Sequence, residues 1–350
     1  MRTSAGLLCL TLLAGRAAGA HEPTLSRFTF REHVRPLFLR HCGGCHRAGG
    51  VAPMSLLEYQ EAVPWANAIK LSLLERRMPP FLPSDDSGPF RDSRTLNARE
   101  LDTLVDWAVG TTPEGQSLAA EESPPPSEEA RADLVLRPPT HVVLEEDENE
   151  KTACVVLPTG LSSPRIVTGL EVVPGQPSIL RRATILVGDS CSSAEPLATW
   201  LPDRKRISFP EGIGRRLAAS SNLLLELRYK KNWGDEGKRI LDESALGLWF
   251  SEEALLPVRS VAIEKLRLDL DEAVRLVALY APAAGEAPVQ VEAVGPDGSS
   301  RVLLSIGRFD SAWSEKYFFR TPILLPAGSS LRLSRSGLWA DFAPVASTDP

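Results

Sequence analysis

The chain has 350 residues, of which 43% are hydrophobic and 24% are charged, so a fibrous or largely disordered protein is excluded and two or three domains are expected. The formal net charge is -6, which argues against a nucleic-acid partner. The mature chain contains no run that is long and apolar enough to form a transmembrane segment.

Residues 1–20 have the features of an export signal. Arg2 precedes a short apolar run, and Ala18-Gly19-Ala20 forms a small-residue cleavage site. A retained membrane anchor is the alternative, but the run is shorter than the ~20 residues that span a bilayer. We therefore expect cleavage after Ala20 and a periplasmic or otherwise exported protein.

Residues 21–113 show helical patterns. Thr29 and Glu32 have capping-box spacing, and Pro36 is expected to interrupt the short helix that follows. Pro64 is expected to start a second helix, and Asn97 with Glu100 to start a third. Residues 114–132 are acidic and contain three consecutive prolines, which is typical of an extended linker.

From residue 133 onwards the pattern becomes that of strands. Short runs rich in Val, Leu and Ile recur between Gly and Pro turns, for example RIVTGLEVVPG, NLLLELRYKK and VRLVALYAP. Such runs are typical of sandwiches and jelly rolls. The stretch is long for one sandwich, so we expect two domains, at residues 133–255 and 256–346.

The clearest motif is Cys42-Gly43-Gly44-Cys45-His46, which matches the attachment pattern of c-type haem. Two thiols three positions apart can each form a thioether to one porphyrin, and the adjacent His46 becomes an axial iron ligand. A thioredoxin-like redox pair and half of a zinc site are the alternatives, but neither explains the histidine. We expect one covalent haem c.

The second axial ligand must come from another part of the chain. Met78, in the stiff segment ERRMPPF, is the expected ligand. Met54 is the other available methionine and is expected to be core filler. His33 and His41 are poorer candidates because both lie on the short segment that leads into the motif.

Two cysteines remain in the mature chain, Cys154 and Cys191. Export to an oxidising compartment favours a disulfide between them. The alternative is two buried thiols in separate strands.

The N-terminal half, from RPLFLRHCGGCH through ERRMPPF to LVDWAVGTTPEG, resembles the c-type domain that is fused ahead of copper type II, ascorbate-dependent monooxygenase-like domains. The resemblance continues through VTGLEVVPGQPSILRRATILV to SAWSEKYFFRTPILLPAGSSLRL. It implies Met78 as the axial ligand and a pair of jelly rolls like those of peptidylglycine α-hydroxylating monooxygenase. The predicted fold class is thus a small all-α cytochrome c domain followed by an all-β double jelly-roll sandwich.

The copper histidines that the resemblance implies are missing. Arg181-Arg182 occupies the position of a His-His pair, and Arg228 that of a third histidine. No histidine follows His141 and no methionine follows Met78, and an arginine is always protonated and does not ligate copper. We expect no copper.

These features predict an exported single-haem protein that carries single electrons, with a copper-free β scaffold that docks in a redox assembly. Its expected partner is a redox protein or a respiratory-type membrane complex in the periplasm. No nucleophile–base pair is evident, so the chain is not expected to be an enzyme by itself. The alternatives are a copper and haem monooxygenase with atypical ligands, and a redox sensor that binds an anion between Arg181, Arg182 and Arg228.

Overall fold

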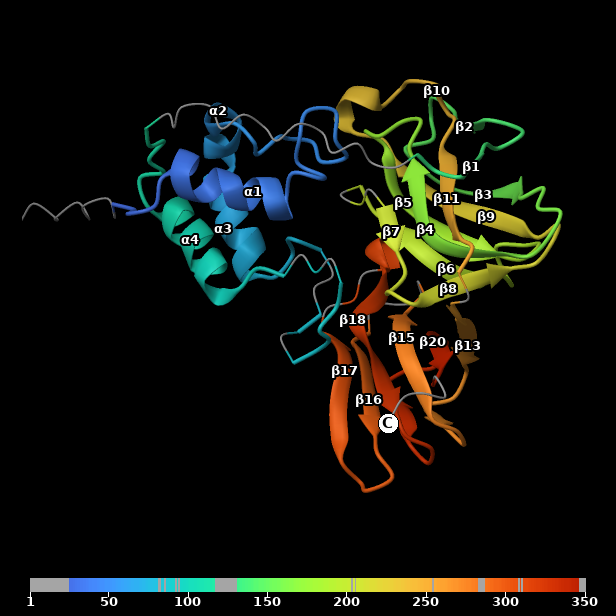
Figure 1. Ribbon diagram of the computed structural model, residues 1–350. Coiled ribbons are helices and arrows are strands. Elements are labelled where there is room, and N and C mark those ends of the chain that lie inside the picture. Colours follow the sequence, from blue (N-terminus) through green and yellow to red (C-terminus); the bar gives the residue numbers. More distant parts are fainter. Residues whose placement is uncertain are drawn as a thin grey trace, which may run out of the picture.

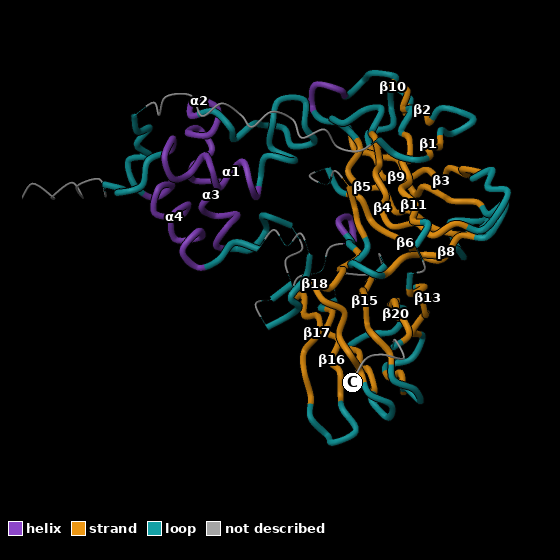
Figure 2. Tube along the Cα trace, in the orientation of Figure 1, coloured by secondary structure: helices purple, strands orange, loops and turns teal. Residues whose placement is uncertain are grey.

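The computed structural model describes residues 25–80, 83–84, 86–91, 93, 95–116, 131–202, 204, 206–253, 255–282, 287–307, 309 and 311–345. The predicted signal peptide and most of the predicted linker lie outside these residues. Figure 1 shows the helices gathered on one side of two β bodies, and Figure 2 shows how little of the chain is helical.

The helices lie within residues 30–109. They are a π-helical turn at Phe30–Val34, α1 (Arg35–His41), α2 (Tyr59–Ala62), a 3₁₀ turn at Val63–Trp65, α3 (Ala66–Leu74) and α4 (Ala98–Val109). Phe30, Phe38 and Trp107 form edge-to-face or tilted ring contacts in their shared core. We call residues 25–80 and 95–116 the helical region.

The helix starts agree only in part with the sequence patterns. At Asn97 the capping box is confirmed: the Glu100 N–H donates to Asn97 Oδ1 at 2.9 Å, and the Asn97 N–H donates to Glu100 Oε2 at 3.0 Å. The box predicted at Thr29 is wrong, because the Thr29 N–H donates to His33 Nδ1 instead and a π-helical turn follows. Pro64 lies within the 3₁₀ turn, so the helix starts two residues later, at Ala66.

The first β body is a sandwich around one hydrophobic core. One sheet has the order β1-β11-β4-β8-β12, with β7 also paired to β4, and the other has the order β3-β9-β5-β6. Their bounds are β1 (Leu134–Leu136), β3 (Glu150–Pro158), β4 (Arg165–Val173), β5 (Leu180–Val187), β6 (Glu195–Trp200), β7 (Arg206–Ser208), β8 (Ile213–Leu217), β9 (Asn222–Lys230), β11 (Ala245–Ser251) and β12 (Leu256–Pro257). A small ribbon of β2 (Val142–Leu144) and β10 (Ile240–Asp242) stands beside them.

The second β body encloses a separate core between two four-stranded sheets. One sheet has the order β13-β20-β15-β18 and the other β14-β19-β16-β17. Their bounds are β13 (Arg259–Ile263), β14 (Arg267–Asp269), β15 (Val274–Tyr280), β16 (Val289–Val294), β17 (Ser300–Ile306), β18 (Lys316–Leu325), β19 (Ser330–Leu333) and β20 (Leu338–Pro344). The predicted domain limits themselves stay predictions, since packing into separate cores does not test independent folding.

The predicted fold class, a small all-α cytochrome c domain ahead of an all-β double jelly roll, is wrong. The described chain is mostly β-sheet, with 20 strands, and its α-helices have only 4 to 12 residues. No separate all-α domain of the cytochrome c type is seen in the described residues. Within the stretch expected to be all-α, Phe90 forms a β-bridge with Phe319 and is buried in the second β core, and the Ser84 N–H donates to the Ser305 carbonyl. Ser84 and Phe90 thus contact the second β body rather than the helices.

Two further findings concern the predicted disulfide and membrane-spanning helices. A disulfide joins Cys154 on β3 to Cys191 in the turn after β5, so this prediction is confirmed. In the part of the chain that the structure describes, no helix is long and apolar enough to cross a membrane.

Candidate haem site

A cavity of about 340 Å³ lies between the helical region and the first β body. Its volume falls within the range of small-molecule and cofactor sites, and most of its lining is apolar. Cys42, Cys45, His46 and Met78 all line it, together with Phe38 from α1, Ile69 and Leu73 from α3, and Arg181 and Trp313 from the β part. The four residues singled out in the sequence for haem attachment thus come together in one apolar cavity.

The Cys-x-x-Cys-His motif continues the last turn of α1. The Cys42 N–H donates to the Phe38 carbonyl at 2.9 Å, and the His46 N–H donates to the Cys42 carbonyl at 2.8 Å. Gly50 then allows the chain to fold back, because a Cβ there would lie 2.4 Å from the Cys45 carbonyl oxygen. This winding brings both thiols and the imidazole to the same cavity.

The His46 ring is held in one orientation by the backbone. Its Nδ1 lies 3.3 Å from the Met54 carbonyl oxygen. A carbonyl only accepts, so Nδ1 carries the proton and Nε2 keeps its lone pair. Burial lowers the pKa of His46, although the same hydrogen bond acts to raise it. A neutral imidazole with a defined tautomer is the state in which histidine ligates a metal.

The two methionines hold different positions around the cavity. Met54 also lines the cavity, and its backbone carbonyl oxygen lies 3.3 Å from His46 Nδ1. Met78 comes from the loop after α3, whose turn is fixed by hydrogen bonds from the N–H groups of Arg77 and Met78 to the Ser72 carbonyl. Met78 is 41% exposed, so its thioether sits at the mouth of the cavity. Both methionines therefore lie close enough to the cavity to supply the second iron ligand, which the sequence predicts to be Met78.

The two motif cysteines are thiols in the structure. Burial, together with the neighbouring Cys45, raises the pKa of the Cys42 thiol to about 12. A dithiol of the thioredoxin type relies on a thiolate with a depressed pKa. The shift therefore speaks against the redox-pair alternative.

Arg181, on β5, closes the cavity from the β side. Its guanidinium donates to the Val51 carbonyl in the loop after the motif, and to Asn232 Oδ1 at 2.7 Å. Its Nε is buried and has no hydrogen-bond partner among the described residues. Burial lowers the pKa of Arg181, while the nearby Cys45 and Glu150 act to raise it. A buried cationic donor that faces the cavity suits the carboxylate of a bound group.

Sequence reasoning missed Arg181 and Trp313 as cavity residues. Arg181 was expected to replace a copper histidine or to bind an anion with Arg182 and Arg228, and nothing in the sequence places it beside Val51, 130 positions away. The other two arginines of that comparison pair with carboxylates: Arg182 lies 3.0 Å from Glu226, and Arg228 lies 4.0 Å from Glu150. Among the described residues, no group of three or more His, Cys, Asp or Glu is arranged to hold a metal ion.

Comparison with known proteins finds no family and no curated protein that matches this chain. Among solved structures, peptide:N-glycanase F is similar at 8% identity and a TM-score of 0.28, over 61% of this chain and 97% of that one. Allantoicase is similar at 8% identity and a TM-score of 0.17, over 56% and 78%. A tandem CBM22 domain of Xyn10C from Paenibacillus barcinonensis is similar at 11% identity and a TM-score of 0.15, over 63% of this chain and 93% of that one. Likenesses at this level assign neither a fold family nor an activity.

Proposed function

We propose that the chain is an exported electron carrier with one covalent haem c, attached through Cys42 and Cys45 and ligated by His46 and Met78. The single observation that carries the proposal is that these four side chains line one apolar cavity. Haem c, when bound, supplies a one-electron redox couple. A methionine–histidine ligand pair gives a higher potential than a pair of histidines, which suits electron transfer.

The chain's own residues support this cofactor in three ways. The cysteines stand as thiols on one turn, as two thioether bonds require. The Met54 carbonyl orients His46 so that Nε2 is the ligating atom. The unsatisfied Nε of Arg181 offers a hydrogen bond to a haem propionate.

We further propose that the β-sandwich bodies carry no copper and serve as a scaffold. Arg181 and Arg182 would place positive charge where the monooxygenase family's copper histidines are expected. Arg182 is 3% exposed and held by Glu226, so it is a fixed part of the sheet. A redox protein or respiratory-type complex of the periplasm would then be the partner.

The first experiment is to express the chain with its export signal in a host that attaches c-type haem, then determine mass, iron and copper. We expect one covalent haem and one iron per chain, and no copper after incubation with copper and desalting. A Cys42→Ser/Cys45→Ser variant should lose the covalent haem. One or two tightly held coppers per chain would instead favour a monooxygenase with atypical ligands.

A further inference from the structure

We propose that a second cleft, beside the haem cavity, binds a small aromatic carboxylate. The cleft has a volume of about 380 Å³ and shares Pro53, Arg181 and Trp313 with the cavity. Its remaining lining comes from β3, β9 and the turns after β9 and before β18: Glu150, Arg228, Lys230, Lys231, Asn232, Trp233 and Ala312.

The charge of the lining favours an anion. Four of the residues are cationic and one, Glu150, is a carboxylate. The hydrogen bond from Lys230 lowers the pKa of Glu150, and although burial opposes it, the charges of Lys230, Arg228 and Arg181 lower it further. The cleft thus has a positive field that a single carboxylate does not neutralise.

Arg228 is the cation best placed to receive a ligand. Its guanidinium lies 4.0 Å from Glu150, too far for a hydrogen bond, whereas Lys230 reaches the same carboxylate at 2.6 Å. Within the described part of the chain, the guanidinium of Arg228 donates no hydrogen bond, and this side chain is about one-third exposed. A planar guanidinium with open donors matches the two oxygens of a carboxylate.

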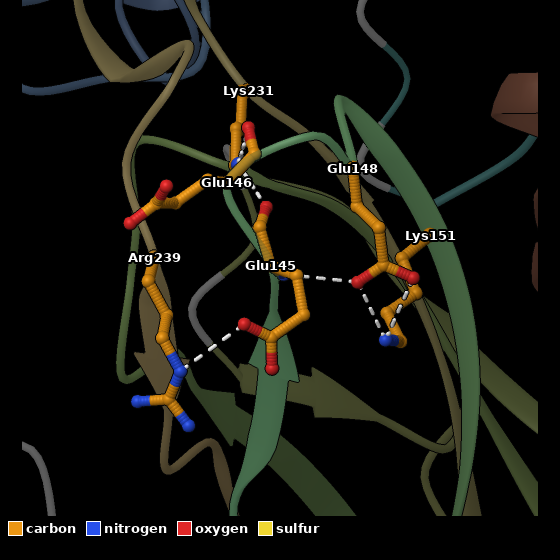
Figure 3. A network of polar contacts seen from close by, with 6 residues as sticks. All are labelled: Glu145, Glu146, Glu148, Lys151, Lys231 and Arg239. Carbon is orange, nitrogen blue, oxygen red and sulfur yellow. Dashed lines mark hydrogen bonds and ion pairs between the residues drawn. The ribbon is translucent and has the colours of Figure 1, made fainter.

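Lys231 adds positive charge to the cleft but is not expected to contact the ligand. It is buried, and its Nζ donates to the carbonyls of Glu145 and Glu146 at 2.6 and 3.3 Å (Figure 3). The same network holds Arg239 on Glu145, at 3.2 Å. The two hydrogen bonds of Lys231 hold the turn that carries the aromatic side of the cleft, whereas Arg239 is not among the residues that line the cleft.

The aromatic part of the ligand is inferred from Trp233. This indole is 73% exposed, although Lys231, two residues earlier in the chain, is buried. Because Trp233 lines the cleft, its exposed ring offers a face on which a flat partner can stack. Asn232 holds the turn in place, because its amide donates to the Ser178 carbonyl at 3.0 Å. A flat ring against Trp233 and a carboxylate on Arg228 together define the ligand class.

Binding in the cleft is coupled to the haem, and this coupling rests on the proposed function. Because the cleft and the cavity share Arg181, an anion bound in the cleft would add negative charge beside the proposed haem site, which would favour the oxidised state of a bound haem. The ligand is then expected to lower the reduction potential, and oxidised protein to bind it more tightly. The binding itself depends only on residues of the chain.

The test is isothermal titration calorimetry of the full-length, haem-loaded chain with 1-naphthoate, and with neutral 1-naphthamide as a matched probe. We expect saturable binding of one naphthoate per chain and at least tenfold weaker binding of the amide. Arg228→Gln should weaken naphthoate binding about tenfold or more, and Trp233→Ala severalfold. Arg239→Gln is the control: it lies in the same segment outside the cleft and should leave the affinity unchanged.

The proposal is overturned if naphthoate does not saturate, if the amide binds equally well, or if Arg239→Gln weakens binding as much as Arg228→Gln. If a variant keeps its disulfide and its circular dichroism spectrum, misfolding is excluded as the reason for a loss of naphthoate affinity. The Cys42→Ser/Cys45→Ser variant separates the two proposals, since naphthoate binding should persist without haem. A wild-type chain that binds naphthoate but carries no haem would refute the proposed function alone. Binding without a shift in potential would overturn the coupling.

Discussion

Arg181 in the first β body donates a hydrogen bond to the carbonyl of Val51, in the loop that follows the Cys-x-x-Cys-His motif. Asn232 reinforces this contact, because its amide lies 3.4 Å from the Gly50 carbonyl oxygen and its Oδ1 accepts from Arg181. The loop behind the candidate haem site is therefore held by a sheet whose residues are far away in the sequence.

Arg181→Gln should loosen the helical region from the β part. Loss of the charged donor is expected to cost about 1–3 kcal/mol of local stability. Hydrogen exchange should show faster exchange around Gly50–Ala52, with little change in the second β body. Arg182→Gln is a contrasting variant, since Arg182 pairs with Glu226 within the sheet. If exchange near Val51 is the same in wild type and Arg181→Gln, the contact does not hold the loop.

The axial ligand is tested by a pair of methionine variants. Met78→Ala should abolish the methionine-to-iron charge-transfer absorption of the oxidised protein and lower its reduction potential. Met54→Ala should keep the band, because Met54 contributes its backbone carbonyl to His46 and that carbonyl survives the substitution. A band that survives Met78→Ala and disappears in Met54→Ala would reverse the assignment.

Gly50 is expected to be the most sensitive position of the motif loop. An added methyl group would lie 2.4 Å from the Cys45 carbonyl oxygen and 3.0 Å from that of Arg47, both backbone atoms. Gly50→Ala should therefore displace the loop, destabilise the helical region by about 2 kcal/mol or more and reduce haem incorporation. Gly49→Ala is the control: its φ of +68° is strained for alanine, but nothing lies within 4 Å, so about 1 kcal/mol is expected. Equal thermal stability of both variants would contradict this packing argument.

Local spacing predicted some parts of the structure and failed at Thr29, whereas most contacts between residues far apart in the sequence could not be predicted. Asn97 and Glu100 are three residues apart and form the expected capping box. The Cys154–Cys191 pair followed from counting cysteines in an exported chain. Phe90 illustrates the opposite case, since its place in the second β core depends on Phe319, which no local pattern reveals. For the same reason the all-α first domain was predicted wrongly, and Arg181 was missed as a neighbour of the motif.

The stability of the helical region should fall in acid through Glu100. Burial acts to raise the pKa of Glu100, but the Asn97 N–H, His41 and Arg40 together lower it below the ordinary value of 4.5. A carboxylate with a lowered folded-state pKa adds stability above about pH 4.5, and this contribution is lost as the pH falls through the folded pKa. The melting temperature of wild type should thus decline more steeply from pH 6 to pH 3 than that of Glu100→Gln. Glu61 is exposed, and Glu61→Gln should show the same dependence of melting temperature on pH as wild type. If all three proteins show the same dependence, Glu100 is not the source of the loss of stability in acid.

The disulfide should make a large contribution to the first β body. It ties β3 to the turn after β5, across 37 residues of chain. Restricting the unfolded chain over that span is expected to stabilise the fold by about 3–4 kcal/mol. Cys154→Ala/Cys191→Ala should therefore unfold at lower guanidinium concentration than wild type, with a steeper slope because the unfolded chain without the cross-link exposes more surface. Reduction of the wild-type protein is the matched control and should shift the transition equally, because both changes remove the same cross-link. If the double variant and oxidised wild type unfold at the same guanidinium concentration, the sandwich core alone determines the stability of this body.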